Sequence, residues 1–289
     1  MRDRYSIDQC ALYRVTTKKK LAEILLTSVS ALKGLSRTSN SRYRRWEEPK
    51  ANGKVRRIED PHPPLKKLHK RVEWLLSGIG APEFLMCPVK GRSYVTNAAV
   101  HRHAIETLTL DIENYFASTT TKRVYWFFHR VMLCSEDVAG LLARLCTVDG
   151  HLPTGSPVSP VLSFYAHFDL WQDIHTMAIK AGWKDTVYMD DLTISGRTPA
   201  YGLEWLIRKR IFRSGLKINE QKTRHYYRGV AEVTGVIVGG GKLRVPKRGH
   251  KKLNDTATAL GAELTTEERN HLRRSLRSIA VQHRQLIRA

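Results

Sequence analysis

The sequence predicts an α+β protein, because strand-like and helical patterns are mixed along the whole chain. The strand-like patterns are short runs of β-branched and apolar residues. One leads into Asp111, and two others flank the pair Asp190 and Asp191. In the helical patterns, apolar residues recur at intervals of three and four. The clearest of these cover residues 65–79, 161–179 and 201–212.

The charge of the chain is its most unusual property. With 49 Lys and Arg against 27 Asp and Glu, the 289 residues carry a formal net charge of +22, which indicates a polyanionic partner such as nucleic acid. A membrane surface is the weaker alternative, because the chain has no signal-like start and no apolar run of the roughly 18 residues that a spanning helix needs. We therefore expect a cytoplasmic protein. The 4 cysteines are scattered and predict neither a zinc site nor disulfides.

The first sixty residues combine a helix with basic segments. Residues 21–32 predict a short amphipathic helix, and the Arg-rich residues 36–45 predict an arm. In residues 53–61, basic and apolar residues alternate as in a half-exposed strand. Lys54 and Arg56 would then share a face and could reach the phosphates of a nucleotide. A solvated strand face is the alternative.

A glycine-containing loop separates the helices in the middle of the chain. It includes Gly155 and Ser156, and it would expose backbone amides at the start of the helix 161–179. Such a loop allows close approach of a base pair or a template strand. Two helices of the core are predicted before it, at residues 121–133 and 135–148.

Two adjacent carboxylates stand out in the second half of the chain. The segment 188–191 predicts a tight hairpin with Asp190 and Asp191 at its tip. Like charges raise each other's pKa, so a divalent cation such as Mg²⁺ would stabilise the pair, although a solvated turn is the alternative. Asp111, at a strand end, would complete a site for two Mg²⁺ ions about 3.5–4 Å apart. Phe116 could then lie under the sugar of a bound nucleotide and exclude a 2′-OH.

The C-terminal part is strongly basic from Pro246 onwards. Before it, residues 233–238 and 243–245 predict strands. The glycines at 239–241 and Lys242 predict a turn that leads into residues 243–245 as a hairpin. A helix with a capping pattern begins near Thr265. Its arginines that could follow a nucleic-acid duplex are Arg269, Arg273 and Arg277.

Together these motifs resemble those of reverse transcriptases, over roughly residues 50 to 250. The segment from Asp111 to Phe116 looks like the first catalytic motif, Gly155-Ser156-Pro157 like the template-and-nucleotide motif, and Tyr188-Met189-Asp190-Asp191 like the acidic hairpin. Within the family the chain is most similar to retron reverse transcriptases, with Asn97-Ala98-Ala99-Val100-His101 as their N-A-x-x-H element and Val233-Thr234-Gly235 as their V-T-G element. Thr154 stands where glutamine is common, and Met189 where retron enzymes usually have alanine.

The resemblance implies a right-hand polymerase with a small antiparallel palm sheet and a helical, basic thumb. We expect an N-terminal arm at 1–45, fingers at 46–107 with part of 120–150, a palm at 108–245 and a thumb at 246–289. Asp111, Asp190 and Asp191 would be catalytic and would bind metal together with Ile112. The expected nucleotide-binding residues are Lys54, Arg56, Phe116, Gly155, Ser156 and Lys222, and those expected near RNA are Asn97, His101, Val233, Thr234 and Gly235.

The resemblance also implies an activity. The protein would be an RNA-directed DNA polymerase with two Mg²⁺ ions that uses dNTPs and a cognate msr–msd noncoding RNA as primer and template. Synthesis from the 2′-OH of an internal guanosine would give a branched RNA–DNA hybrid, msDNA, in an antiphage system with a separate effector protein. One alternative is another reverse transcriptase, group II intron-like or defence-associated, that is primed differently. A non-catalytic RNA-binding scaffold is the alternative of a different class.

Overall fold

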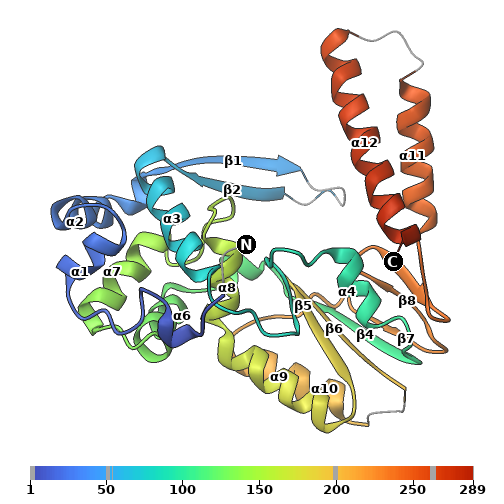
Figure 1. Ribbon diagram of the computed structural model, residues 1–289, viewed down its shortest axis with the longest axis horizontal. Coiled ribbons are helices and arrows are strands. Elements are labelled where there is room, and N and C mark those ends of the chain that lie inside the picture. Colours follow the sequence, from blue (N-terminus) through green and yellow to red (C-terminus); the bar gives the residue numbers. More distant parts are fainter. Residues whose placement is uncertain (1–3, 50–52, 54, 198–200, 261–264, 289) are drawn as a thin grey trace. The chain divides into compact units, whose positions relative to one another are not determined.

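The computed structural model describes residues 4–49, 53, 55–197, 201–260 and 265–288. They form two compact units, each built from segments that are far apart in the sequence (Figure 1). The first unit consists of Met1–Glu83, Ile112–Ile174 and Leu206–Ile218, and the second of Phe84–Asp111, His175–Trp205 and Asn219–Ala289. The α+β class is confirmed. The boundaries of arm, fingers, palm and thumb stay predictions.

The first unit is mostly helical, with one two-stranded sheet. In α3 (Pro63–Leu76), Leu65, Leu68 and Val72 are buried, which confirms the predicted helix. Strands β1 (Tyr43–Pro49) and β2 (Val55–Pro61) pair antiparallel, which confirms the predicted strand. Its other elements are η1 (Ile7–Gln9), α1 (Lys18–Ile24), α2 (Val29–Arg37), η2 (Ser39–Ser41), α5 (Tyr115–Ser118), α6 (Thr121–Trp126), η3 (Phe127–Val131), α7 (Glu136–Cys146) and α8 (Ser159–Ala166).

Three predicted helices are interrupted. The helix expected at 21–32 is wrong as a single element, because Leu26 has φ 55° and the Ser28 side chain caps the start of α2. The helix expected at 161–179 divides into α8 and α9 (Phe168–Lys180) at His167, where φ is −117° and ψ is 28°. The helix expected at 121–133 changes after α6 into the π-helical turn η3. A periodic apolar pattern does not show such local changes of backbone.

A five-stranded sheet dominates the second unit, in the order β3-β5-β6-β4-β7. All neighbouring strands are antiparallel except β3 and β5, which are parallel. One face of β4 and β6 carries Leu108, Leu110, Leu192 and Ile194, all buried. The other face is polar, since side chains alternate along each strand. The strands are β3 (Leu85–Cys87), β4 (Glu106–Asp111), β5 (Lys184–Tyr188), β6 (Asp191–Gly196) and β7 (Arg224–Tyr226).

A second, three-stranded sheet packs against helix α4 (Tyr94–Val100). Val95 and Ala98 of the helix share a buried apolar cluster with Val233 and Val236 of the sheet. The strands β8 (Val230–Val233), β9 (Val236–Gly239) and β10 (Lys242–Arg244) are antiparallel neighbours. The predicted strand 233–238 is therefore interrupted by a turn.

Two basic helices follow the three-stranded sheet. Helices α11 (Lys247–Ala259) and α12 (Thr266–Arg288) contact each other along their length as an antiparallel pair (Figure 1). The predicted C-terminal helix is confirmed as α12. Within the part of the chain that the structure describes, none of the helices combines the length and the apolar composition that a membrane crossing requires.

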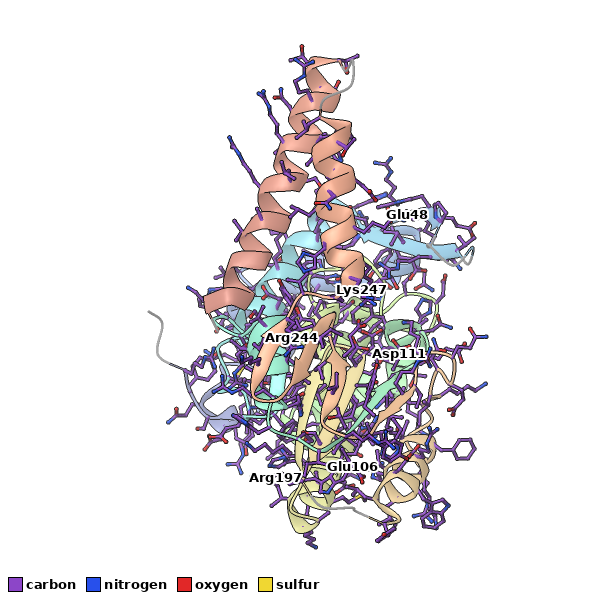
Figure 2. All side chains as sticks on the ribbon, turned by 90° about the vertical axis from the view of Figure 1, so that its right-hand side faces the viewer. Glu48, Glu106, Asp111, Arg197, Arg244 and Lys247 are labelled. Carbon is purple, nitrogen blue, oxygen red and sulfur yellow. The ribbon has the colours of Figure 1, made fainter. Side chains whose placement is uncertain are left out.

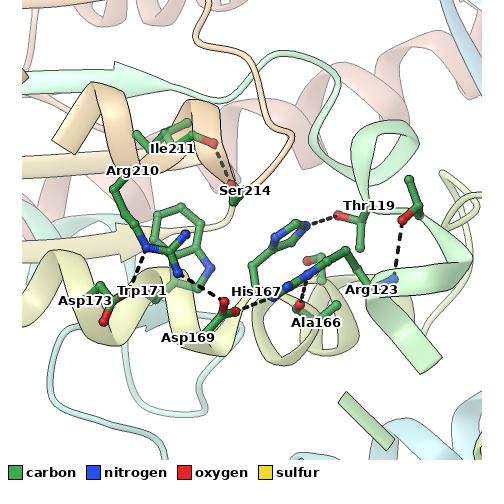
Figure 3. A network of polar contacts seen from close by, with 12 residues as sticks. Thr119, Arg123, Ala166, His167, Asp169, Trp171, Asp173, Arg210, Ile211 and Ser214 are labelled. Carbon is green, nitrogen blue, oxygen red and sulfur yellow. Dashed lines mark hydrogen bonds and ion pairs between the residues drawn. The ribbon is translucent and has the colours of Figure 1, made fainter. Parts of the chain in front are cut away.

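In the first unit, a charged network joins the parts of α9 and of α10 (Leu203–Arg213) that belong to this unit (Figure 3). The two carboxylate oxygens of Asp169 accept hydrogen bonds from Arg123 and, at 3.1 Å, from Arg210. Arg210 also donates through Nε to Asp173 at 2.6 Å. Arg123 donates in addition to the carbonyl of Ala166 at 2.8 Å, and its guanidinium lies over the Trp126 ring. One carboxylate thus joins three helices.

Replacing this carboxylate by an amide tests the network. Asp169→Asn should lower the free energy of unfolding at pH 7 by roughly 1 kcal/mol, because one side of the amide cannot accept a hydrogen bond. Burial raises the pKa of Asp169, but the bonds from Arg123 and Arg210 outweigh burial and lower it. The stabilisation is therefore present above the unfolded pKa of about 4 and is lost as the pH falls through the folded value.

Chemical denaturation at pH 7 and pH 3 measures the difference between wild type and Asp169→Asn. We expect it to shrink at pH 3, and an equal difference at both values would contradict the role of the ionised carboxylate. Asp173→Asn is the matched control. It removes a single bond at a side chain that is 54% exposed, against 34% for Asp169, so its effect should be smaller.

Candidate active site

Asp111 and Asp191 face each other across the central strands of the five-stranded sheet. Strand β4 ends at Asp111, β6 begins at Asp191, and the two residues are directly paired. The hairpin of β5 and β6 closes on the pair Tyr188 and Asp191, which leaves Met189 and Asp190 as a two-residue turn. Met189 has φ 61°, the left-handed conformation that tight hairpin turns use. The predicted acidic hairpin is confirmed.

A turn in the chain brings Lys222 to the same place. The N–H of Asn219 donates to the carbonyl of Asp111 at 2.8 Å, and the N–H of Lys222 donates to the carbonyl of Asn219 at 3.1 Å. The Lys222 ammonium donates to Asp111 Oδ2 at 2.6 Å. Asp111, at one end of β4 with Glu106 at the other (Figure 2), is only 6% exposed. The ammonium therefore compensates a carboxylate that water hardly reaches.

The surroundings of Asp191 and Lys222 shift the pKa of both groups. Burial and the charges of Asp190 and Asp111 raise the pKa of Asp191 to about 7, against a smaller opposing effect of Lys222. Partial burial lowers the pKa of Lys222, but its bond to Asp111 and the three negative charges outweigh burial and raise it. The site therefore disfavours the ionised form of Asp191 and favours the protonated form of Lys222.

The residues fit a divalent cation by their chemistry. Carboxylate oxygens are the ligands that Mg²⁺ prefers, and burial together with the charges of Asp190 and Asp111 raises the pKa of Asp191, which a bound cation would lower. As the side chains are placed, no group of three or more His, Cys, Asp or Glu among the described residues could hold a metal ion. A cation would have to compete with Lys222 for Asp111. A metal-binding role for Ile112, which is buried, stays a prediction.

The nucleotide-binding residues predicted on β2 and on the glycine-containing loop lie in the first unit. Arg56 is exposed on β2, and the N–H of Glu59 on the same strand donates to the carbonyl of Thr154 at 2.6 Å. Gly155 has φ 123°, and a Cβ there would lie 3.2 Å from the carbonyl oxygen of Glu59. The loop therefore depends on glycine to pack against β2. Lys54 lies outside the described residues.

Ser156 differs from its prediction. It is 4% exposed, and its hydroxyl donates to Nδ1 of His69 at 2.7 Å, while Nε2 of His69 donates to the carbonyl of Leu145 at 2.7 Å. The side chain thus anchors the loop, and a nucleotide-binding role for Ser156 stays a prediction. Burial lowers the pKa of His69 to about 4. The sequence feature that could have predicted this buried role of His69 is its place on the apolar face of α3, between Leu68 and Val72.

Phe116 belongs to α5 in the first unit and is partly exposed. Its ring lies beside Tyr115 with centroids 6.1 Å apart. Tyr115 is buried, and its hydroxyl donates to the carbonyl of Ser163 at 2.9 Å. The residue next to Phe116 is therefore fixed in place. The role of Phe116 as a sugar gate stays a prediction.

The two elements expected near RNA contact each other. The amide Nδ2 of Asn97 donates to Oγ1 of Thr234 at 3.2 Å, and that hydroxyl donates to the carbonyl of Tyr94 at 3.1 Å. Thr234 and Gly235 form the two-residue turn between β8 and β9, with φ 44° and 82°. Asn97, His101 and Val233 are at most 1% exposed, which leaves these side chains no surface to offer to RNA. An RNA contact at this place is predicted only for the turn itself.

The predicted thumb arginines lie on the surface of α12. They are spaced by four residues, so they share one face of the helix, and their side chains are exposed. Contact with nucleic acid stays a prediction for all three, which are Arg269, Arg273 and Arg277.

The chain is similar to reverse transcriptases, and specifically to those of retrons, as its motifs indicated. It is 29% identical to the Retron Se72 reverse transcriptase of Salmonella heidelberg over 217 residues, 68% of this chain and 56% of the relative. It is 28% identical to the Retron Ec86 reverse transcriptase of Escherichia coli over 237 residues, 78% and 72% of the two chains. Identity to the Retron Mx65 reverse transcriptase of Myxococcus xanthus is 32% over 252 residues, 77% and 58%.

The matched region spans 56% to 72% of the length of these curated relatives. No family model matches the chain. Among solved structures, a foamy viral protease-reverse transcriptase in complex with double-stranded DNA aligns with 96% of this chain and 50% of its own, at a TM-score of 0.45 and 15% identity.

The raised pKa of Asp191 has a consequence for stability. A carboxyl group whose folded pKa is raised favours folding less as the pH rises, and its cost is absent below pH 4 and complete above pH 7. In EDTA, Asp191→Asn should therefore increase the free energy of unfolding at pH 8 by roughly 1–2 kcal/mol. This is less than the roughly 4 kcal/mol that a shift from 3.8 to about 7 equals, because water screens a partly exposed group.

Urea unfolding at pH 5 and pH 8 measures this gain. The gain should be larger at pH 8 than at pH 5, and Asp173→Asn, a surface control, should show no gain at either pH. A loss of stability in Asp191→Asn at pH 8 would contradict the proposed crowding of negative charge.

Proposed function

We propose that the chain is the polymerase of a retron, an RNA-directed DNA polymerase. The observation that carries this proposal is the direct pairing of Asp111 with Asp191 next to Asp190, in a chain similar to retron reverse transcriptases over most of its length. A non-catalytic scaffold would have no need for an aspartate whose pKa is raised by burial and by two neighbouring carboxylates.

Two Mg²⁺ ions would supply the charge neutralisation that phosphoryl transfer requires. Asp111 and Asp191 would hold them from neighbouring strands, and Asp190 from the turn. Lys222 would leave Asp111 when a cation binds and become available to the pyrophosphate group. Its raised pKa keeps it protonated, so it is suited to donate hydrogen bonds or a proton to the leaving oxygens.

The residues that we propose for binding the dNTP belong to the first unit. Arg56 would contact the triphosphate, with Lys54 in the same role by the sequence pattern. Gly155 would offer its backbone, since a side chain there would collide with β2. Ser156 would contribute by fixing this loop through His69.

The template would be a cognate structured noncoding RNA that also serves as primer. Synthesis from the 2′-OH of an internal guanosine would give branched msDNA. The net charge of +22 supports a nucleic-acid partner, and the exposed arginines of α12 supply part of the surface. A separate effector protein in an antiphage system and a cytoplasmic location complete the proposal.

The acids are tested by replacing two of them. Asp190→Asn together with Asp191→Asn should lower DNA synthesis by at least about 10³-fold, because two of the three proposed cation ligands are lost, and should leave RNA affinity within about twofold. Primer extension and a filter-binding assay measure the two quantities. Asp173→Asn is the control and should retain full activity. Synthesis at near the wild-type rate in the double variant would refute the assignment.

Phe116 is tested by its effect on sugar selection. Phe116→Ala should raise the incorporation of ribonucleotides relative to deoxyribonucleotides by about tenfold or more, because the ring would no longer meet a 2′-OH. Competition between rNTP and dNTP in primer extension measures the ratio. Phe212→Ala, at a ring that is 76% exposed, is the control. Unchanged selectivity in Phe116→Ala would remove the sugar-gate role.

A further inference from the structure

His101 forms a buried bridge between two strands of the acidic hairpin. It follows the last residue of α4 and is 1% exposed. Its Nδ1 lies 2.7 Å from Oγ of Ser195 on β6, and its Nε2 lies 2.7 Å from Oγ1 of Thr186 on β5. Both hydroxyl-bearing residues are buried too, at 3% and 1%. One imidazole therefore joins β5 to β6 through two short hydrogen bonds.

The bridge lies on the same face of the hairpin as a catalytic acid. Thr186 on β5 is paired with Thr193 on β6, and Ser195 lies two residues beyond Thr193 on β6. The His101 ring therefore connects two residues that are diagonal neighbours in the hairpin. Side chains alternate along a strand, which places Asp191 on the face of Thr193 and Ser195. Asp191 lies four residues of strand, roughly 13 Å, from Ser195, and two residues, roughly 7 Å, from Thr193, the partner of Thr186.

The chemistry of the bridge suits a permanent support. A neutral imidazole has one acceptor and one N–H donor, and a hydroxyl can match either. Burial, with a smaller contribution from Lys184, lowers the pKa of His101 to about 3, so the ring stays neutral at working pH. The bridge therefore carries no charge of its own at working pH.

Helix α4 gives the bridge a fixed base. Ser93 and Thr96 form a reciprocal capping box at its start. Val95 and Ala98 pack into the apolar cluster of the three-stranded sheet, and Asn97 bonds to Thr234 in the β8–β9 turn. The helix that carries His101 is thus held by a second sheet and cannot simply follow movements of the hairpin.

We propose that His101 is a positioning residue of the polymerase: its bridge between Thr186 and Ser195 fixes the twist of the hairpin and thereby the placement of Asp191 against Asp111. This inference rests on the proposed function. A displacement of about 1 Å at reacting groups can cost roughly 10²-fold in rate. Since the bridge is some distance from the acids, we expect about a tenfold loss of kcat when it is broken. The KM for dNTP should stay within about twofold, because no nucleotide-binding residue changes.

The experiment compares variants on a primed RNA template with Mg²⁺. Thr186→Val and Ser195→Ala each remove one hydroxyl, His101→Leu removes both bonds, and His101→Gln retains a donor and an acceptor. His167→Leu is the control, since it removes another buried histidine that bonds a hydroxyl, that of Thr119, outside the hairpin. Melting temperature is measured for each variant beside kcat and KM.

We expect kcat to fall in Thr186→Val, Ser195→Ala and His101→Leu, and to be partly restored in His101→Gln. In His167→Leu, kcat should fall less than in His101→Leu although the two variants lose a similar amount of melting temperature. Wild-type kcat in folded Thr186→Val and Ser195→Ala would overturn the inference, as would a fall of kcat that follows melting temperature alike in all variants. If His101→Leu does not fold, the hydroxyl variants decide. A wild-type protein that makes no DNA would refute the proposed function, which is a separate outcome.

Discussion

The repulsion among three carboxylates, those of Asp111, Asp190 and Asp191, is the constraint that the rest of the second unit has to accommodate. Backbone pairing of β4 with β6 sets Asp111 opposite Asp191, and a two-residue turn adds Asp190, so the strands impose a charge density that the side chains alone would avoid. Burial of the apolar face behind the site offsets this electrostatic cost. Buried residues on that face, such as Leu110 and Leu192, hold the strands together. Lys222 relieves part of the repulsion, and a bound cation would relieve more.

Neutral buried histidines provide much of the polar support around the motifs. His69 fixes Ser156 in the first unit, and His101 joins Thr186 to Ser195 in the second. Burial is the largest cause of a lowered pKa in both. Such groups cross-link loops and strands without adding charge, which suits a chain that already carries an excess of 22 positive charges.

The sequence was sufficient for the acidic hairpin, because strand periodicity, turn length and two aspartates agree at that one place. It was also sufficient for the class of the fold and for the likeness to retron reverse transcriptases. The sequence was not sufficient to predict whether a polar side chain of a motif lies on the surface or in the interior. Asn97 and His101 stand in a motif expected near RNA, yet both are buried, since Thr234 and the hairpin hydroxyls lie far away in sequence and form hydrogen bonds with them only after folding. The breaks at Leu26 and His167 likewise depend on local backbone conformation that apolar periodicity does not encode.

The most direct measurement is to purify the protein from its native locus and to analyse the nucleic acid that accompanies it. We expect RNA joined to a short complementary DNA through a 2′-5′ linkage, detected by sequencing together with debranching treatment. Unbranched DNA would keep the polymerase chemistry of the acidic hairpin but contradict priming from an internal guanosine. RNA without any DNA, from a protein with all three aspartates intact, would contradict the central claim that this chain copies RNA into DNA.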